Sequence, residues 1–257
     1  MIFMRVLKSL CLAFSMYSKI PMPNVYWSKE NMRYSLCFLP VIGAVVGGLL
    51  MAWFSICLKL GINNACFAAA AAAIPVFVTG GIHTDGFIDT SDALSSYGDK
   101  QKKLEILKDP HVGAFGIINA VVYYLLYFGF LNEIKIYGEA AMLALGFVMS
   151  RSVCAVSIMM LRCAKNTGLL FKFSTAANKP VTLAVTMLML LGCAFVVILL
   201  SAYIGAAVLL SLVILFFYYR FVIYNKFGGI TGDTCGWLIK MCELITVIVV
   251  VIGGKLV

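Results

Sequence analysis

The chain has 257 residues, of which 63% are hydrophobic and only 12% are charged, and its mean hydropathy is +1.01. A soluble domain carries about 25% charged residues, so this composition excludes a soluble globular protein and indicates an integral membrane protein with several spans. The net charge of +9 is attributed to basic loops that set membrane topology, and not to nucleic-acid binding. Composition is even along the chain, so residues 1–257 are expected to form a single integral membrane domain.

In chain order, an amphipathic helix with Arg5 and Lys8 on its polar side and a turn at Pro21-Met22-Pro23 are expected before the first span. A spanning helix needs about 20 apolar residues. Seven apolar segments satisfy or approach this length, namely Leu36–Leu58, Ala65–Thr79, Phe115–Leu131, Ala140–Leu161, Val181–Leu200, Tyr203–Tyr224 and Cys242–Val251. The second is short and is expected to run on through the polar stretch His83–Asp92. We therefore predict an all-α, polytopic membrane bundle of about seven transmembrane helices.

The distribution of basic residues predicts the orientation of the bundle. Sixteen of the twenty Lys and Arg residues fall in the segments 1–35, 80–112, 162–180 and 220–240, which share one side of the membrane if the N-terminus is cytoplasmic. Three lie in connections on the other side, and Arg151 lies within the fourth span. Lys and Arg accumulate in cytoplasmic loops. The N-terminal segment and the three longer polar loops are therefore predicted to be cytoplasmic.

The first polar cluster reads Gly80-Gly81-Ile82-His83-Thr84-Asp85-Gly86 and continues to Asp89 and Asp92. The three aspartates are spaced i, i+4 and i+7, so on a helix they share one face. Clustered carboxylates repel each other unless a cation lies between them, and Mg²⁺ is the usual hard cation for oxygen ligands. We predict a Mg²⁺ site made by Asp85, Asp89 and Asp92. The alternative is a solvated helix start, where acids interact favourably with the helix dipole.

Two other features of this cluster suit a phosphorylated ligand. Gly80 and Gly81 permit a close approach of the backbone to a phosphate group. His83 lies two residues from Asp85 and is a candidate general base or metal ligand.

The second polar cluster is Gly228–Gly236, followed by Glu243 on the next helix. Its loop offers backbone N–H groups, hydroxyls and one carboxylate to a phosphate or its metal, through Thr231, Gly232, Asp233 and Thr234. The alternative is an ordinary turn between helices. Because the predicted topology places this loop on the same side as the first cluster, a shared site is favoured.

Three further residues are candidates for binding. Asp109 either caps the third span or joins the polar site, and His111 either binds a ligand or belongs to a polar network. Arg151 lies about midway through the fourth span, where an unpaired arginine is unfavourable by several kcal/mol. It is expected to face the bundle and to meet an aspartate of the first cluster or a substrate phosphate. The basic segment Arg162–Lys179 holds an anionic substrate or only enforces topology, and both interpretations stay open.

These motifs together resemble the cobalamin synthase family, the adenosylcobinamide-GDP ribazoletransferases. The resemblance runs from Ile20 to Glu243, nearly the whole chain. Its most specific parts are Gly80–Gly86 with Asp89 and Asp92, Asp109 with Gly113–Gly116, and Gly229–Thr234. One departure is Asp109-Pro110-His111, where many members look like Asp-Ser-Arg. If that arginine touches phosphate in those members, the contact is here weaker, protonation-dependent or supplied elsewhere.

The resemblance implies a multi-pass enzyme of the bacterial or archaeal inner membrane. It would join adenosylcobinamide-GDP to α-ribazole or α-ribazole 5′-phosphate, with Mg²⁺ as cofactor, and would release GMP together with adenosylcobalamin or its phosphate. The number of subunits is left open. The implied catalytic residues are Asp85, His83 and Asp233, and the implied substrate-binding residues are Gly80, Gly81, Arg151, Thr231, Gly232, Thr234, Asp109 and His111.

Two alternative functions fit some of the same residues. A cation-coupled transporter also places acids and an arginine within membrane helices, but its charged site belongs near the midplane. Here the acids cluster in loops on one predicted face, which favours an enzyme. Another membrane phosphotransferase, acting on a CDP-alcohol, would differ from the first interpretation in its substrate alone.

Overall fold

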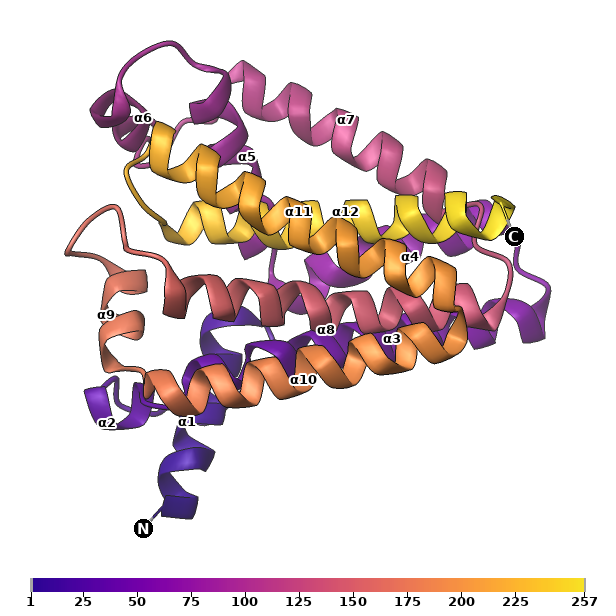
Figure 1. Cartoon of the computed structure of the whole chain (residues 1–257), viewed down its shortest axis with the longest axis horizontal. Helices are drawn as coiled ribbons and strands as arrows, with labels where there is room; N and C mark the ends of the chain where they lie inside the picture. The colour runs from indigo at the N-terminus through magenta and orange to yellow at the C-terminus, as the bar shows by residue number, and fades with distance from the viewer. Residues whose placement is uncertain (1, 257) are drawn as a thin grey trace.

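Every backbone N–H and C=O group inside a bilayer needs a partner within the protein, and a helix supplies these partners within one segment. The apolar runs of this chain accordingly fold as helices. The structure, a computed structural model, describes residues 2–256, and these residues form helices and loops without any β-strand (Figure 1). The predicted all-α fold class is confirmed, and the nine cysteines are all free thiols.

Six helical stretches are long and apolar enough to cross a membrane. The first contains α2 (Lys29–Met32), the 3-10 turn η1 (Ser35–Phe38) and α3 (Leu39–Leu60), and the others are α7 (Ala114–Leu131), α8 (Tyr137–Met160), α10 (Lys179–Leu200), α11 (Ala202–Lys226) and α12 (Gly232–Leu256). The 16-residue α4 (Asn64–Thr79) gives a seventh span when it is taken together with the following α5 (Ile82–Ser95). The multi-pass bundle is thus confirmed.

The central helix of the bundle is α8, which packs against α3, α10 and α12. In the most apolar stretch of α8, 89% of the residues are buried, whereas in the corresponding stretch of α10 only 17% are buried. α10 instead exposes a row of large apolar side chains, including Leu188, Leu191, Phe195 and Leu199. In a membrane these side chains face lipid, so α8 and α12 form the interior and α7, α10 and α11 form much of the outer wall.

α4 and α5 together can form one span, which fits the expectation that the second span runs on through His83–Asp92, but this span is sharply bent. α4 ends at Gly80, α5 begins after Gly81, and the two helices meet at an angle of 98°. Both glycines adopt left-handed backbone conformations, with φ of 65° and 82°. Side chains with a Cβ rarely adopt this conformation, so two consecutive glycines let the chain turn sharply here. The bend directs α5 against α12 and α7.

The segment 220–240, expected to be a loop, is mostly helical. α11 extends to Lys226 and α12 begins at Gly232, so the connection is confined to residues 227–231. The expected final span, Cys242–Val251, therefore starts ten residues too late. The first half of α12 buries polar residues such as Lys240 and Glu243 against the other helices. Because these residues are polar, a search for apolar runs does not detect the first half of this span.

The polar connections gather at one end of the bundle, at the left of Figure 1. This end carries α2, α6 (Lys100–Ile106) and α9 (Leu169–Ala176), and α1 (Ile2–Tyr17) packs there against α2 and η1. A short parallel bridge joins two of its loops: Ala164 N donates to Ile230 O (2.9 Å), and Ile230 N donates to Arg162 O (2.9 Å). The C-terminus lies at the opposite end.

The predicted orientation can be tested with two cysteines at opposite ends. The Tyr97 side chain is 97% exposed between α5 and α6, and Cys66 is exposed where α4 begins, beside the α7–α8 connection. We expect a membrane-impermeant maleimide to label Cys66 in intact cells, and to label Tyr97→Cys, made in a Cys66→Ser background, only in inverted vesicles. Labelling of Tyr97→Cys in intact cells would show that the orientation is reversed.

Candidate active site

The site is built on an unusually close contact between α5 and α12. A Cβ added at Gly86 would lie 2.7 Å from the carbonyl oxygen of Asp233, and one added at Gly236 would lie 3.0 Å from the carbonyl oxygen of His83. Small residues of this kind let two membrane helices bring their backbones together. The first turns of the two helices therefore lie side by side, although about 150 residues separate them in sequence.

This contact brings the two predicted acidic motifs to one place. Asp85 and Asp233 line the same cavity, and Asp89 is half-buried within the electrostatic reach of Asp85, Asp233 and Asp92. Asp233 accepts a hydrogen bond from the Thr231 hydroxyl (3.4 Å). Carboxylates in such proximity repel each other, and a cation removes the repulsion.

Asp92 has a different environment from the other aspartates of its helix. Its Oδ1 accepts a hydrogen bond from the backbone N–H of Gly116 (3.2 Å), in the first turn of α7. A Cβ at Gly113, which precedes α7, would overlap the Asp92 carboxylate. Asp92 thus satisfies a free N–H group at the start of α7, a structural role that sequence alone did not reveal.

The remaining carboxylates suit a magnesium ion. Among residues 2–256, no three His, Cys, Asp or Glu side chains converge closely enough to enclose a metal. Mg²⁺ rarely needs such an enclosure, because it keeps several waters and binds through one or two carboxylates together with substrate phosphates. The all-oxygen donors Asp85, Asp89 and Asp233 fit that requirement.

The second motif starts α12 with two threonines that cap each other. Thr231 N donates to the Thr234 hydroxyl (2.9 Å), and Thr234 N donates to the Thr231 hydroxyl (3.2 Å). The buried Thr234 hydroxyl also meets the Tyr219 hydroxyl (3.2 Å). Thr234 therefore fixes the loop from inside, whereas Thr231, Gly232 and Asp233 line the cavity.

The cavity has a volume of about 380 Å³ and walls of two kinds. Its polar wall contains Asp85 and Asp233 from the two motifs and also Lys108 and Lys165. Its apolar wall comes from α1, α3, α8 and α9 and includes Tyr17, Leu39, Ile158, Phe171 and Phe173. A ligand with both an anionic group and an apolar or aromatic part matches these walls.

His83 lies at the base of this cavity and is only 6% exposed. Its ring stacks near Tyr17, with 6.5 Å between ring centroids and 22° between ring planes. The Nε2 atom has no hydrogen-bond partner in the protein. A buried nitrogen without a partner is costly, so a ligand that supplies one is favoured at this atom.

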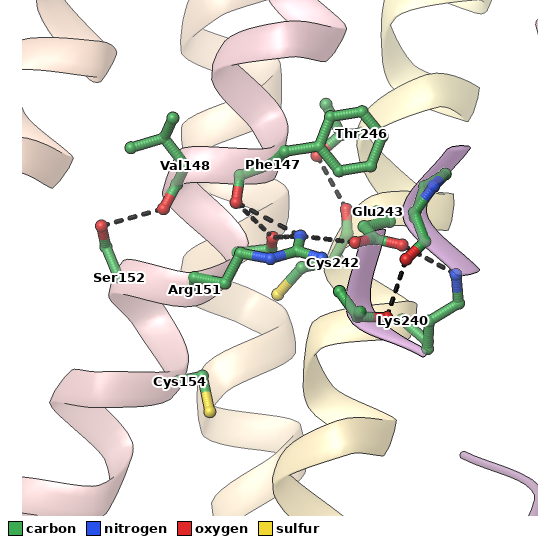
Figure 2. Close-up of polar contacts among 12 residues, drawn as sticks. Phe147, Val148, Arg151, Ser152, Cys154, Lys240, Cys242, Glu243 and Thr246 are labelled. Carbon is green, nitrogen blue, oxygen red and sulfur yellow. Dashed lines mark hydrogen bonds and ion pairs between the residues drawn. The ribbon is translucent and has the colours of Figure 1, made fainter. Parts of the chain in front are cut away.

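Arg151 forms no ion pair with an aspartate of the first cluster, contrary to expectation, and it does not line the cavity. Its side chain is completely buried and forms an ion pair with Glu243 of α12, as Figure 2 shows. The same nitrogen, Nη1, donates to Phe147 O (3.3 Å) and to the Ser150 hydroxyl (3.0 Å). Arg151 therefore joins α8 to α12 within the bundle.

A second buried cation completes this network. Lys240 Nζ donates to the other Glu243 oxygen (2.8 Å) and lies 4.8 Å from the centre of the Tyr123 ring. The Tyr124 and Tyr127 rings also face it. Aromatic faces attract a desolvated cation. One carboxylate thus holds two positive charges, one from its own helix and one from α8.

Asp109 and His111, expected to bind substrate, face the exterior. Asp109 Oδ1 accepts hydrogen bonds from the backbone N–H of His111 (2.9 Å) and lies 2.8 Å from its Nδ1. These hydrogen bonds hold the pKa of Asp109 below its usual value. Neither residue lines the cavity, and Asp109 does not cap α7.

For two pairs of residues, the structure shows a position that the sequence alone did not establish. Gly80 and Gly81, expected near a phosphate, form the bend between α4 and α5 and do not line the cavity. Lys108 and Lys165 do line it, which agrees for Lys165 with the open interpretation of Arg162–Lys179 as a segment that holds an anion. Neither lysine could be singled out, because a lysine in a basic cytoplasmic loop has no sequence signal that separates binding from topology.

Fold and site together define a multi-pass membrane protein with a carboxylate-rich cavity at one end of its bundle. Residues 9–251 match the cobalamin-5-phosphate synthase family, and the chain belongs to that family. This result confirms the family predicted from the motifs.

Curated relatives cover almost the whole chain. An adenosylcobinamide-GDP ribazoletransferase of Lachnoclostridium phytofermentans is 40% identical over 250 residues, which are 97% of this chain and 95% of that protein. Proteins of the same name from Fusobacterium nucleatum and Clostridium botulinum are 30% and 29% identical, over 93% of this chain and 95% and 94% of theirs. No solved structure matches.

The buried network predicts a strong dependence of stability on Glu243. Glu243→Gln leaves Arg151 and Lys240 buried without a counter-charge, which is expected to cost about 3–5 kcal/mol. The measurement is the Tm of the purified protein in detergent. Glu133→Gln is the matched control, because it breaks the exposed pair with Lys255 and should change the Tm little. Equal Tm values for both variants would contradict a structural role of the network.

Proposed function

We propose that this protein is an adenosylcobinamide-GDP ribazoletransferase that joins adenosylcobinamide-GDP to α-ribazole or α-ribazole 5′-phosphate. The observation that carries the proposal is the meeting of Asp85 and Asp233, from two distant motifs, on one cavity. The family and the names of its members supply the substrates. The chain is thus an enzyme of cobalamin synthesis, and we place it in the inner membrane with its cavity toward the cytoplasm.

The reaction transfers the cobinamide phosphoryl group from GMP to the ribazole hydroxyl. The ribazole hydroxyl oxygen forms a bond to the phosphorus on the cobinamide side of the pyrophosphate, the bond from that phosphorus to the GMP oxygen breaks, and the hydroxyl proton passes to a base. The protein has to align the two substrates and offset their anionic charge. Mg²⁺, which Asp85 and Asp89 would hold with Asp233 nearby, would supply part of the positive charge that offsets it.

Other residues of the cavity have proposed roles in phosphate binding, proton transfer and orientation of the hydroxyl. Gly232, at the start of α12, would offer its backbone N–H to phosphate oxygens, and Thr231 lines the cavity beside it. Asp233 is the proposed acceptor of the hydroxyl proton. His83 is buried and its Nε2 atom has no hydrogen-bond partner among the described residues, so its proposed role is to orient the hydroxyl through Nε2.

The proposal is tested by product formation. Purified protein is incubated with Mg²⁺, adenosylcobinamide-GDP and either α-ribazole or its 5′-phosphate, and products are separated by chromatography. The expected result is a cobalamin product and GMP in equal amounts. Absence of a cobalamin product with both acceptors would overturn the proposal, and GMP release without cobalamin would indicate a hydrolase.

The shared acidic site predicts that both motifs are needed for turnover. Asp85→Asn and Asp233→Asn keep the side-chain shape and remove a charge, and each should lower kcat at least about a hundredfold. Glu133→Gln, at an exposed position beside the C-terminal end of α7, serves as control and should retain activity. Removal of metal with a chelator should abolish turnover, and added Mg²⁺ should restore it. Normal turnover by either aspartate variant would refute the site.

A comparison of Asp89 and Asp92 variants distinguishes a metal ligand from a residue that supports the start of α7. Asp92→Asn retains an oxygen that accepts the Gly116 N–H, so the Mg²⁺ concentration for half-maximal activity should stay near the wild-type value. In Asp89→Asn the same concentration should rise about tenfold or more, because a ligand charge is lost. A similar rise in both variants would place Asp92 among the metal ligands.

A further inference from the structure

Two lysines from separate loops meet at the cavity. Lys108 follows α6 and Lys165 precedes α9, and both line the cavity together with Asp85 and Asp233. Lys165 Nζ reaches toward Leu104 O (3.5 Å), on the helix that leads to Lys108, and the charge of Lys108 acts on Lys165. Like charges that line one cavity are unfavourable unless an anion joins them.

The position of Lys165 is fixed by the backbone next to it. Ala164 N donates to Ile230 O (2.9 Å), so Lys165 is one residue from the bridge to the loop that carries Thr231 and Asp233. This lysine is therefore not a free surface side chain, because its backbone is held in register with the second acidic motif.

The charges of the cavity do not cancel within the protein. Across the described part of the chain, neither Lys108 nor Lys165 forms an ion pair with a carboxylate, and neither do Asp85 and Asp233 with a cation. Burial and the adjacent charge of Lys108 lower the pKa of Lys165. Two separated sets of charge, one positive and one negative, thus face a single cavity.

A third feature favours an anion at the positive side. The eight-residue helix α9 begins at the cavity, since Thr167, Gly168, Leu169 and Leu170 all line it. Gly168 supplies no side-chain cap, and the first turn contains no acid. Free N–H groups and the positive end of the helix dipole are therefore left for a ligand.

We propose that Lys108, Lys165 and the N-terminus of α9 form a phosphate-binding subsite for a substrate, within the cavity that also contains Asp85 and Asp233. The inference rests on the proposed function for its substrates, both of which offer such a group: the donor carries a pyrophosphate, and the phosphorylated acceptor carries a 5′-phosphate. Lysine ammonium groups and helix N-termini recognise the phosphate itself, whichever substrate carries it.

Kinetics distinguishes the two sources of phosphate. Lys108→Gln and Lys165→Gln should each raise a KM about tenfold, and the double variant about a hundredfold, because each removes a charge-assisted hydrogen bond. If the subsite binds the acceptor, the KM of α-ribazole 5′-phosphate rises and that of α-ribazole does not. If it binds the donor, the KM of adenosylcobinamide-GDP rises with either acceptor. Lys→Arg at each position should restore most of the loss.

Two lysines serve as matched controls. Lys102→Gln and Lys172→Gln remove the same charge from α6 and α9 at exposed positions outside the cavity. Unchanged KM values for all three substrates in the Lys108 and Lys165 variants would overturn the proposal. So would an equal rise in the control variants, because the effect would then be one of net charge.

A binding test that needs no turnover separates this inference from the proposed function. Lys165 should react faster than Lys172 with an acetylating ester, because a lowered pKa increases its neutral amine fraction. Inorganic pyrophosphate should slow acetylation of Lys108 and Lys165 several-fold and leave Lys172 unaffected, as measured by peptide mass spectrometry. Equal rates with and without pyrophosphate would refute the subsite, whereas protection would support it even if no cobalamin product formed.

Discussion

Glu243 holds two positive charges inside the bundle, and the relative position of α8 and α12 depends on it (Figure 2). Arg151 and Lys240 are buried where water cannot solvate them, so the shared carboxylate, and for Lys240 also the facing tyrosine rings, replace part of their hydration. Glu243 lies ten residues beyond Asp233 on α12, about 15 Å deeper along the helix. A network at this depth fixes the rotation of α12 and thereby the direction in which Asp233 faces.

With α12 fixed in this way, the contact at Gly86 and Gly236 determines the geometry of the cavity. The carboxylates come from helices that touch through their backbones, whereas the lysines come from two loops, of which the loop of Lys165 is tied by a short bridge to the loop before α12. Rigid helices are suited to hold a metal and the reacting groups. Loops with charged side chains are suited to adjust to a bulky anionic substrate and to release it.

Much of this arrangement could be predicted from sequence because it follows from local patterns. Apolar runs located the spans, and the spacing of Asp85 and Asp89 placed them on one helix. The failures have a common cause in partners that are distant in sequence. Arg151 pairs with Glu243, 92 positions away, and Asp92 meets the start of α7, so neither assignment follows from neighbouring residues. In the sequence, Lys108 and Lys165 cannot be distinguished from lysines that only set membrane topology, because their shared position at the cavity results from the fold.

The shortness of α4 has a consequence for the surrounding lipid. Its 16 residues extend about 24 Å, whereas the hydrocarbon core of a bilayer is about 30 Å thick. The sharp bend at Gly80 and Gly81 therefore falls below the membrane surface, and α5 turns aside at that depth. Such hydrophobic mismatch makes the adjacent bilayer thin. Amphiphilic substrates can then reach the carboxylates from the headgroup layer, and the acyl-chain length of the membrane becomes a determinant of access to the cavity.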